Sequence, residues 1–367
     1  WSTKGDVWNT PSPFTKALPF GYFGGGTTNG STVDRIDYSS DTGTASVKGP
    51  LSSARQSLAA TGNASFGYFG GGAPSYSTVD RIDYSNDTAT AVVKGPLSFG
   101  RKGLRATGNA SFGYFSCGFY YTSIVDRIDY SNDTATAAVK GPLSVAKARA
   151  AATGNTDFGY FGGGQPTMST VDRIDYSNDT ATAAAKGPLS AARYGLAASS
   201  AQVNGLPQTT LFPASSSARE NVVPQGADFG YFSGSYPVTS TVDRVDYSND
   251  TATAAVKGPL SAAMKYLAAT GNADFGYFGG GGHYGGPPNT STVDRIDYSN
   301  DTGTAPAKGP LSSVRGGLAA SSSRANAIPL KGPGNLEVSV SLGAFSRNFG
   351  PQGTDFGYFG GGGPPAV

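Results

Sequence analysis

The sequence predicts an all-β protein made of one small unit repeated around an axis. A phrase of β-branched, acidic and aromatic residues, first present as Ser31-Thr-Val-Asp-Arg-Ile-Asp-Tyr38, occurs six times, and three of the five steps between its closing tyrosines are 46 residues long. Self-similarity at this period indicates units that stack on copies of themselves. No segment has a sustained 3.6-residue apolar period, so we expect almost no helix.

Four short strands can be assigned within one unit. Alternating aromatic and glycine side chains, turn-forming Asn and Gly, and a terminating Gly95-Pro96 set their limits. The strand that contains Phe66 and Tyr68 carries aromatic residues on both faces, so we expect both faces to be buried. The predicted strands are Arg55–Thr61, Ser65–Phe69, Thr78–Tyr84 and Ala89–Lys94. Four antiparallel strands covered on both faces and repeated around an axis predict a β-propeller.

Composition excludes several other classes of protein. Charged residues make up only 14% of the chain and the formal net charge is +2, which is typical of neither a disordered acidic tail nor a nucleic-acid binder. Cys117 is the only cysteine, so an internal disulfide framework and a multi-cysteine metal site are excluded. No apolar run approaches the roughly 18 residues of a membrane span. We therefore expect no nucleic-acid partner and no membrane insertion.

The number of blades is not fixed by the repeats. The aromatic-glycine strand occurs seven times, from Phe20 to Phe356, whereas the Asp-Arg-Ile-Asp strand or its valine variant occurs six times. A ring closed by mixed amino- and carboxyl-terminal strands is therefore expected, with seven blades favoured and six as the alternative. In seven blades, residues 1–8 would complete the last one; in six, Phe20 and Phe356 would compete for one place. We predict one domain, 1–367, with insertions at 199–227 and 320–354.

Each unit carries four features in a fixed order: an aromatic strand ending in paired glycines, a Val-acidic-x-aromatic-Asp strand, a Pro-Leu step and an arginine. Examples are Tyr68–Gly72, Val79–Asp83, Gly95–Ser98 and Arg101. In this ordered set, the repeats resemble those of the kelch family. The chain departs from that pattern where alanine replaces the family's tryptophan, as at Ala89, and where Lys147 and Met264 occupy the arginine position. The near-identical copies also resemble repeat proteins of marine bacteriophage tails or fibres, which implies a virion component.

Variation among the copies is concentrated in the linker between the second and third strands. These linkers should emerge together on one side of the disc, and a rigid frame that presents variable loops is typical of recognition. The alternative is neutral drift in unconstrained loops. The residues that we expect to contact a ligand are large aromatic or adaptable side chains in these loops: Tyr76, Phe119, Tyr120, Tyr121, Met168, Tyr236, His283 and Tyr284.

Catalysis finds little support in the residue types. His283 is the only histidine and has no evident orienting partner. Asp80 and Asp83, with Arg81 between them, recur in every unit, which favours an ion-pair ladder between strands or blades over a glycosidase carboxylate pair. The Asn and Asp of the turns lack the ligand spacing of a calcium loop. We expect no catalytic residues, no metal and no cofactor.

The combined expectation is a noncatalytic structural and interaction module located in a virion tail or outside the cell. Its loops would bind a host-surface glycan or protein, and its insertions would contact other virion or surface proteins. The alternatives are a secreted, lectin-like propeller of a microbe and, with less support, a propeller enzyme such as a glycosidase or oxidase.

Overall fold

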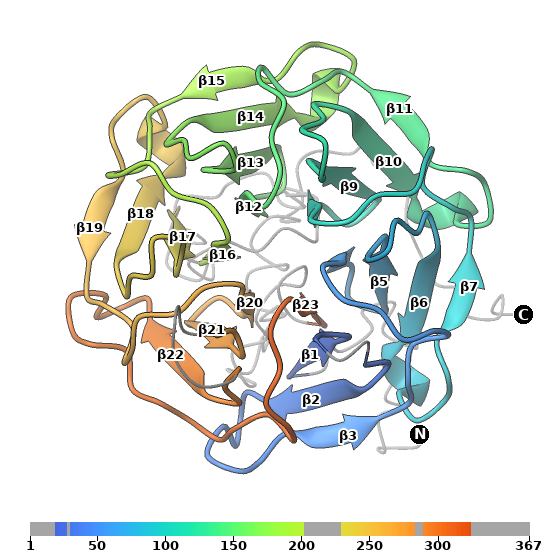
Figure 1. Cartoon of the computed structure of the whole chain (residues 1–367), viewed down its shortest axis with the longest axis horizontal. Coiled ribbons are helices and arrows are strands. Elements are labelled where there is room, and N and C mark those ends of the chain that lie inside the picture. Colours follow the sequence, from blue (N-terminus) through green and yellow to red (C-terminus); the bar gives the residue numbers. More distant parts are fainter. Residues whose placement is uncertain (1–18, 28–29, 202–228, 283–288, 324–367) are drawn as a thin grey trace, which may run out of the picture. The chain divides into compact units, whose positions relative to one another are not determined.

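The computed structural model describes residues 19–27, 30–201, 229–282 and 289–323. All of them belong to one compact unit, Trp1–Pro329. Six small antiparallel sheets surround a central axis as the blades of a β-propeller (Figure 1). The only helices in the described ranges are three-residue 3-10 turns such as η1 (Tyr84–Asn86) and η5 (Tyr247–Asn249). The all-β propeller that the sequence predicts is therefore confirmed.

Each blade runs from an innermost strand to an outermost strand. The innermost strands are β4 (Ala59–Gly62), β8 (Arg105–Gly108), β12 (Ala151–Gly154), β16 (Ala197–Ser200), β20 (Ala268–Gly271) and β23 (Ala319–Ser322). The second strands are β1 (Phe20–Gly24), β5 (Phe66–Gly70), β9 (Phe112–Ser116), β13 (Phe158–Gly162), β17 (Phe229–Ser233) and β21 (Phe275–Gly279).

The outer half of each blade is less uniform. The third strands are β2 (Val33–Asp37), β6 (Val79–Asp83), β10 (Val125–Asp129), β14 (Val171–Asp175), β18 (Val242–Asp246) and β22 (Val293–Asp297). The outermost strands are β3 (Ser46–Lys48), β7 (Val92–Lys94), β11 (Ala138–Lys140), β15 (Ala184–Lys186) and β19 (Ala255–Lys257). In the remaining blade, a single bridge between Asp294 and Ala307 takes the place of a fourth strand.

The ring has six blades, the alternative to the favoured count of seven, and it closes with mixed strands as expected. β23 pairs with β1, so Ala319–Ser322 from late in the chain and Phe20–Gly24 from near its start share one sheet. Phe20 fills the contested position, while Phe356 and residues 1–8 lie outside the described residues. Residues 199–200 and 320–322, which were assigned to the insertions, are the ends of β16 and β23. The rest of each insertion, apart from Ala201 and Ser323, lies outside the described ranges.

The first predicted strand starts too early. β4 begins at Ala59 rather than Arg55, because the Arg55 side chain turns inward before the strand and is completely buried. Its guanidinium donates to the Asp80 carboxylate at 2.8 Å and to the Phe69 carbonyl at 3.1 Å. Arg55, which the sequence pattern places in a strand, thus fixes the connection between two blades.

Neighbouring blades are joined by one repeated set of contacts. The Tyr68 ring is fully buried and stacks on Tyr130 of the next blade, with ring centroids 4.7 Å apart. The Tyr68 hydroxyl donates to Asp133 at 2.9 Å, and Arg81 and Lys94 pair with the same carboxylate at 2.7 and 3.1 Å. An arginine–aspartate ladder therefore runs between blades, but its aspartates are turn residues such as Asp133 and not the strand residues Asp80 and Asp83. Equivalent contacts occur across the closure of the ring, where Tyr277 stacks on Tyr38 and donates to Asp41.

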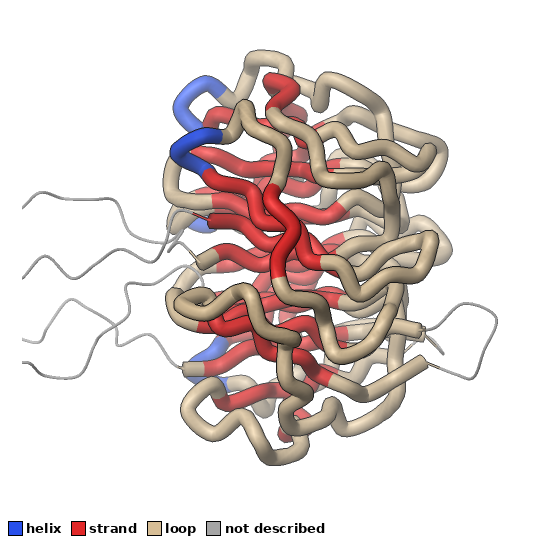
Figure 2. Tube along the Cα trace, turned by 90° about the vertical axis from the view of Figure 1, so that its left-hand side faces the viewer, coloured by secondary structure: helices blue, strands red, loops and turns tan. Residues whose placement is uncertain are grey.

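The two sides of the disc differ. The 3-10 turns lie together on one side, and long loops extend from the other (Figure 2). We call the second side the loop face; it carries the linkers between second and third strands, such as 71–78, and the connections into the next innermost strand, such as 95–104. Backbone hydrogen bonds join them, since Gly72 donates to Arg101 and Ala73 donates to Gln56. No helix in the described part of the chain is long and apolar enough to cross a membrane.

Candidate functional site

Six residues form a closed collar of backbone hydrogen bonds around the central channel on the loop face. Each lies two positions before the first residue of an innermost strand, and each N–H donates to the collar carbonyl of the blade before it at 2.7–2.9 Å. The collar residues are Ser57, Gly103, Arg149, Gly195, Tyr266 and Gly317, and all have positive φ, between 51° and 73°. The circle of bonds is possible only because the left-handed backbone turns every N–H toward its neighbour.

Half of the collar is strained. Glycine adopts this backbone freely, whereas a residue with a Cβ atom incurs about 1–2 kcal/mol. Ser57, Arg149 and Tyr266 nevertheless occupy it, with φ of 58°, 51° and 59°. Strained positions of this kind cluster at functional sites. Their side chains are therefore candidates for ligand binding.

The collar surrounds a cavity of about 270 Å³ at the mouth of the channel. Three cationic side chains line it, from Lys102, Arg105 and Arg149, together with the aromatic rings of Phe119 and Tyr266. Uncharged polar side chains, glycines, Ala73 and Leu318 complete the wall, and no carboxylate lies among the lining residues. The cavity is therefore concave, partly aromatic and positively charged.

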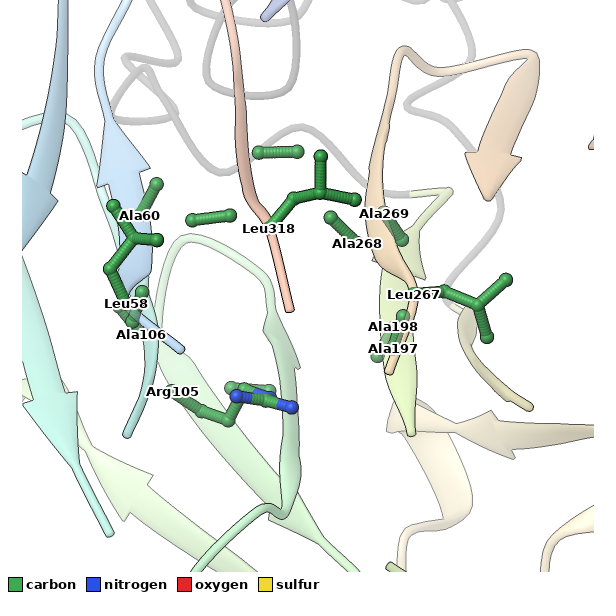
Figure 3. Close-up of a pocket in the computed structure, with 14 residues that line it drawn as sticks. Leu58, Ala60, Arg105, Ala106, Ala197, Ala198, Leu267, Ala268, Ala269 and Leu318 are labelled. Carbon is green, nitrogen blue, oxygen red and sulfur yellow. The ribbon is translucent and has the colours of Figure 1, made fainter. Parts of the chain in front are cut away.

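Arg105 is the one large polar side chain in a channel otherwise lined by alanine and leucine (Figure 3). The five equivalent residues of the other innermost strands are alanines, including Ala59 and Ala151. The Arg105 guanidinium donates to the Leu104 carbonyl at 2.8 Å and reaches toward the Leu196 carbonyl at 3.5 Å. Burial, with a smaller contribution from the charge of Arg149, lowers the pKa of Arg105 to about 10, so Arg105 stays protonated at neutral pH.

Arg149 is held in place by aromatic rings. Its guanidinium carbon lies 4.4 Å from the Phe119 ring centroid and 5.0 Å from that of Tyr266, and Nη1 donates to the Tyr266 hydroxyl at 3.0 Å. The Tyr194 ring lies 6.0 Å away and packs on Tyr236 with centroids 5.0 Å apart. Arg149 therefore contacts Phe119 directly and is connected to Tyr236 through Tyr194.

The remaining loop residues are placed as follows. Tyr76, Tyr120 and Tyr121 are exposed, Tyr120 to 92%, whereas Phe119, Met168 and Tyr236 are half-buried. Tyr120 and Tyr121 have φ of 75° and 53°, so the backbone of this loop is also left-handed. His283 and Tyr284 lie outside the described residues.

The sequence contains a signal for the collar that lies outside the variable linkers. The dipeptide before each innermost strand varies among the copies as much as the linkers do, for example Gln56-Ser57, Lys102-Gly103 and Lys265-Tyr266. These dipeptides lie between segments that are nearly identical in all copies, so their variation is easily overlooked. Comparing the six copies column by column would have identified both the collar and Arg105.

The repeated carboxylates all have structural partners. Asp80 accepts hydrogen bonds from Arg55 and Ser52. Asp83 accepts from the backbone N–H and the hydroxyl of Ser85 and thereby caps η1. In the described part of the chain, no three His, Cys, Asp or Glu side chains come together as a metal site. Cys117 is buried, which raises the pKa of its thiol to about 11 and keeps it protonated.

Comparison with known proteins identifies the fold only. No protein-family model matches the chain, and no curated protein is similar to it. The solved structure titled "Structure of YjhT" is similar over 80% of this chain and 95% of that chain, with a TM-score of 0.59 and 13% sequence identity. This likeness supports the propeller architecture.

Proposed function

We propose that the chain is a noncatalytic propeller that binds a partner through its loop face. The observation that supports this most is Tyr120, an aromatic side chain that is 92% exposed on a loop whose backbone is left-handed at two successive tyrosines. Contact between water and the apolar faces of an exposed ring is unfavourable. A left-handed backbone at a tyrosine costs conformational energy. Both costs are offset when the ring is buried against a ligand.

The proposal includes a place in a virion tail or fibre, where the partner would be a glycan or protein of the host surface. This part is based on the resemblance of the repeats to phage proteins. Ala201 and Phe229, the described residues on either side of the insertion after β16, lie on the side of the 3-10 turns, since Phe229 pairs with Asp246 just before η5. We propose that this insertion contacts other subunits.

The recognition proposal can be tested on a glycan array with the full chain. We expect binding to a subset of glycans, and we expect the double variant Tyr120→Ala, Tyr121→Ala to lose at least about tenfold in affinity, because aromatic anchors carry much of the energy of such contacts. Val139→Ala is the matched control, since Val139 is an exposed apolar side chain on outermost strand β11.

Equal binding by wild type and the double variant would contradict recognition through this loop. The virion proposal has its own test, which is sedimentation of the chain from its native source. It should sediment with large particles, and recovery as a free monomer would exclude a virion role.

A further inference from the structure

We propose that the mouth of the central channel is a binding site for a small ligand that carries an oxyanion, such as a carboxylate, sulfate or phosphate group. The site deepens the proposed recognition function, because the mouth opens on the loop face. Four features support the proposal. The cations of the mouth lack carboxylate partners, the cavity is concave, Arg149 is held rigidly, and Arg105 replaces the alanine of the other five innermost strands.

The cations of the mouth differ from most others in the described part of the chain. Seventeen described lysines and arginines form an ion pair with an aspartate. Lys102, Arg105 and Arg149 have no carboxylate partner among the described residues, and all three line the same cavity. Among the described residues, an aspartate thus neutralises most positive charges, whereas three cations without one meet at this site.

The unpaired charges oppose one another. Arg149 lowers the pKa of Arg105, which means that the two guanidinium groups repel across the mouth. A concave site lined by charge of one sign, with low-dielectric alanine walls beneath it, concentrates the field on a ligand of opposite sign. An anion between the two side chains would remove this repulsion and accept hydrogen bonds from both.

Arg149 is preorganised for such a ligand. The two aromatic rings and the Tyr266 hydroxyl fix the guanidinium plane, so little side-chain entropy remains to be lost on binding. The backbone at Arg149 is left-handed, at a collar position where three other blades have glycine. Glycine would relieve the strain, so the arginine is retained at a cost to stability.

The cavity can hold a small ligand or one unit of a larger ligand. Its volume is about 270 Å³, and it is open to solvent. This volume suits a small organic acid, one acidic sugar unit or an inorganic anion. Ser57 and Gln56 on the wall supply uncharged polar groups that could meet hydroxyls beside the anionic group.

The test is calorimetric titration of the full chain with three probes. Glucuronate and glucose share a sugar ring and differ in the carboxylate, and inorganic sulfate supplies an anion without a ring. We expect glucuronate to bind at least about tenfold more tightly than glucose, because charge-assisted hydrogen bonds dominate. Sulfate binding comparable to glucuronate would assign the site to the anion alone, and tighter glucuronate binding would assign it to an acidic sugar.

Two variants use residues that the chain itself places at the equivalent positions. Arg105→Ala and Arg149→Gly should each weaken glucuronate and sulfate at least about tenfold. Both should melt no lower than wild type, because five copies have alanine and three have glycine at those positions. Lys186→Gln, on outermost strand β15, removes one positive charge far from the mouth and should leave affinity unchanged.

Equal affinity for glucose and glucuronate, or undiminished anion binding by both arginine variants, would overturn the proposal. Failure of all three probes would also overturn it. That result is distinguishable from failure of the recognition proposal, because the Tyr120 and Tyr121 variants are assayed against glycans on a separate array. Tyrosine-dependent binding without anion binding would leave recognition standing and exclude the mouth as an anion site.

Discussion

At the scale of single residues, one blade lacks a contact that the other five have. The buried aspartate at the second position of each third strand pairs with an inward-facing cation, as Asp80 does with Arg55 and Asp172 does with Lys147. Met264 occupies that position opposite Asp294, which has no cationic partner among the described residues. Burial raises the pKa of Asp294, while hydrogen bonds from Ser261 lower it.

We predict that Met264→Arg stabilises the protein by roughly 1.5–3 kcal/mol at neutral pH, the range for a hydrogen bond to a charged group. The arginine would pair with a buried carboxylate that now carries its charge alone. Thermal and urea unfolding of wild type and variant measure the difference. Met264→Leu is the control, since it keeps an apolar side chain and should bring no gain.

The effect should depend on pH. Because the pKa of Asp294 is raised in the folded protein, its stabilising contribution is present below the ordinary value of 3.8 and is lost as pH rises through the folded pKa. An arginine partner lowers that pKa and reverses the dependence. The advantage of Met264→Arg should therefore grow between acidic and neutral pH; a constant advantage would contradict this account of Asp294.

At the scale of elements, the glycine before each Pro-Leu step sets the distance between neighbouring blades. The Gly95 N–H donates to the Asp133 carbonyl of the next blade at 2.8 Å. A Cβ atom on Gly95 would overlap the backbone carbonyl of Ala135, and the same holds for the other five copies, for example Gly141 against Ala181. In the sequence, Gly95-Pro96 indicated only the end of a strand.

We predict that Gly95→Ala destabilises the protein by about 3 kcal/mol or more, because two backbones would have to separate. Gly43→Ala is the matched control. Gly43 has open space around it and corresponds to Ala89 and Ala135 in other copies, so this change should be neutral or slightly stabilising. Melting temperatures compare the two, and similar values would mean that the blades are not in such close contact.

At the scale of the whole molecule, the sequence predicts the features that depend on residues close together in the chain. Strand order, burial on both faces of Phe66–Gly70 and the sidedness of the loops follow from alternation and turn residues. The blade count does not, because Phe20-Gly-Tyr-Phe and Phe356-Gly-Tyr-Phe are identical and pairing with β23 is decided between residues about 300 positions apart. The mouth was missed for another reason: Arg105 and Arg149 depart from their copies inside a repeat that is otherwise nearly constant, outside the variable linkers.

The most direct test of the account is an experimental structure of the full chain with glucuronate bound. The central claim is that Arg105 and Arg149, at the mouth of the channel on the loop face, hold the anionic group of the ligand. We predict a carboxylate within hydrogen-bonding distance of Arg105 and Arg149, inside the collar. An empty mouth at saturating glucuronate, or glucuronate bound on the face of the 3-10 turns, would contradict the claim.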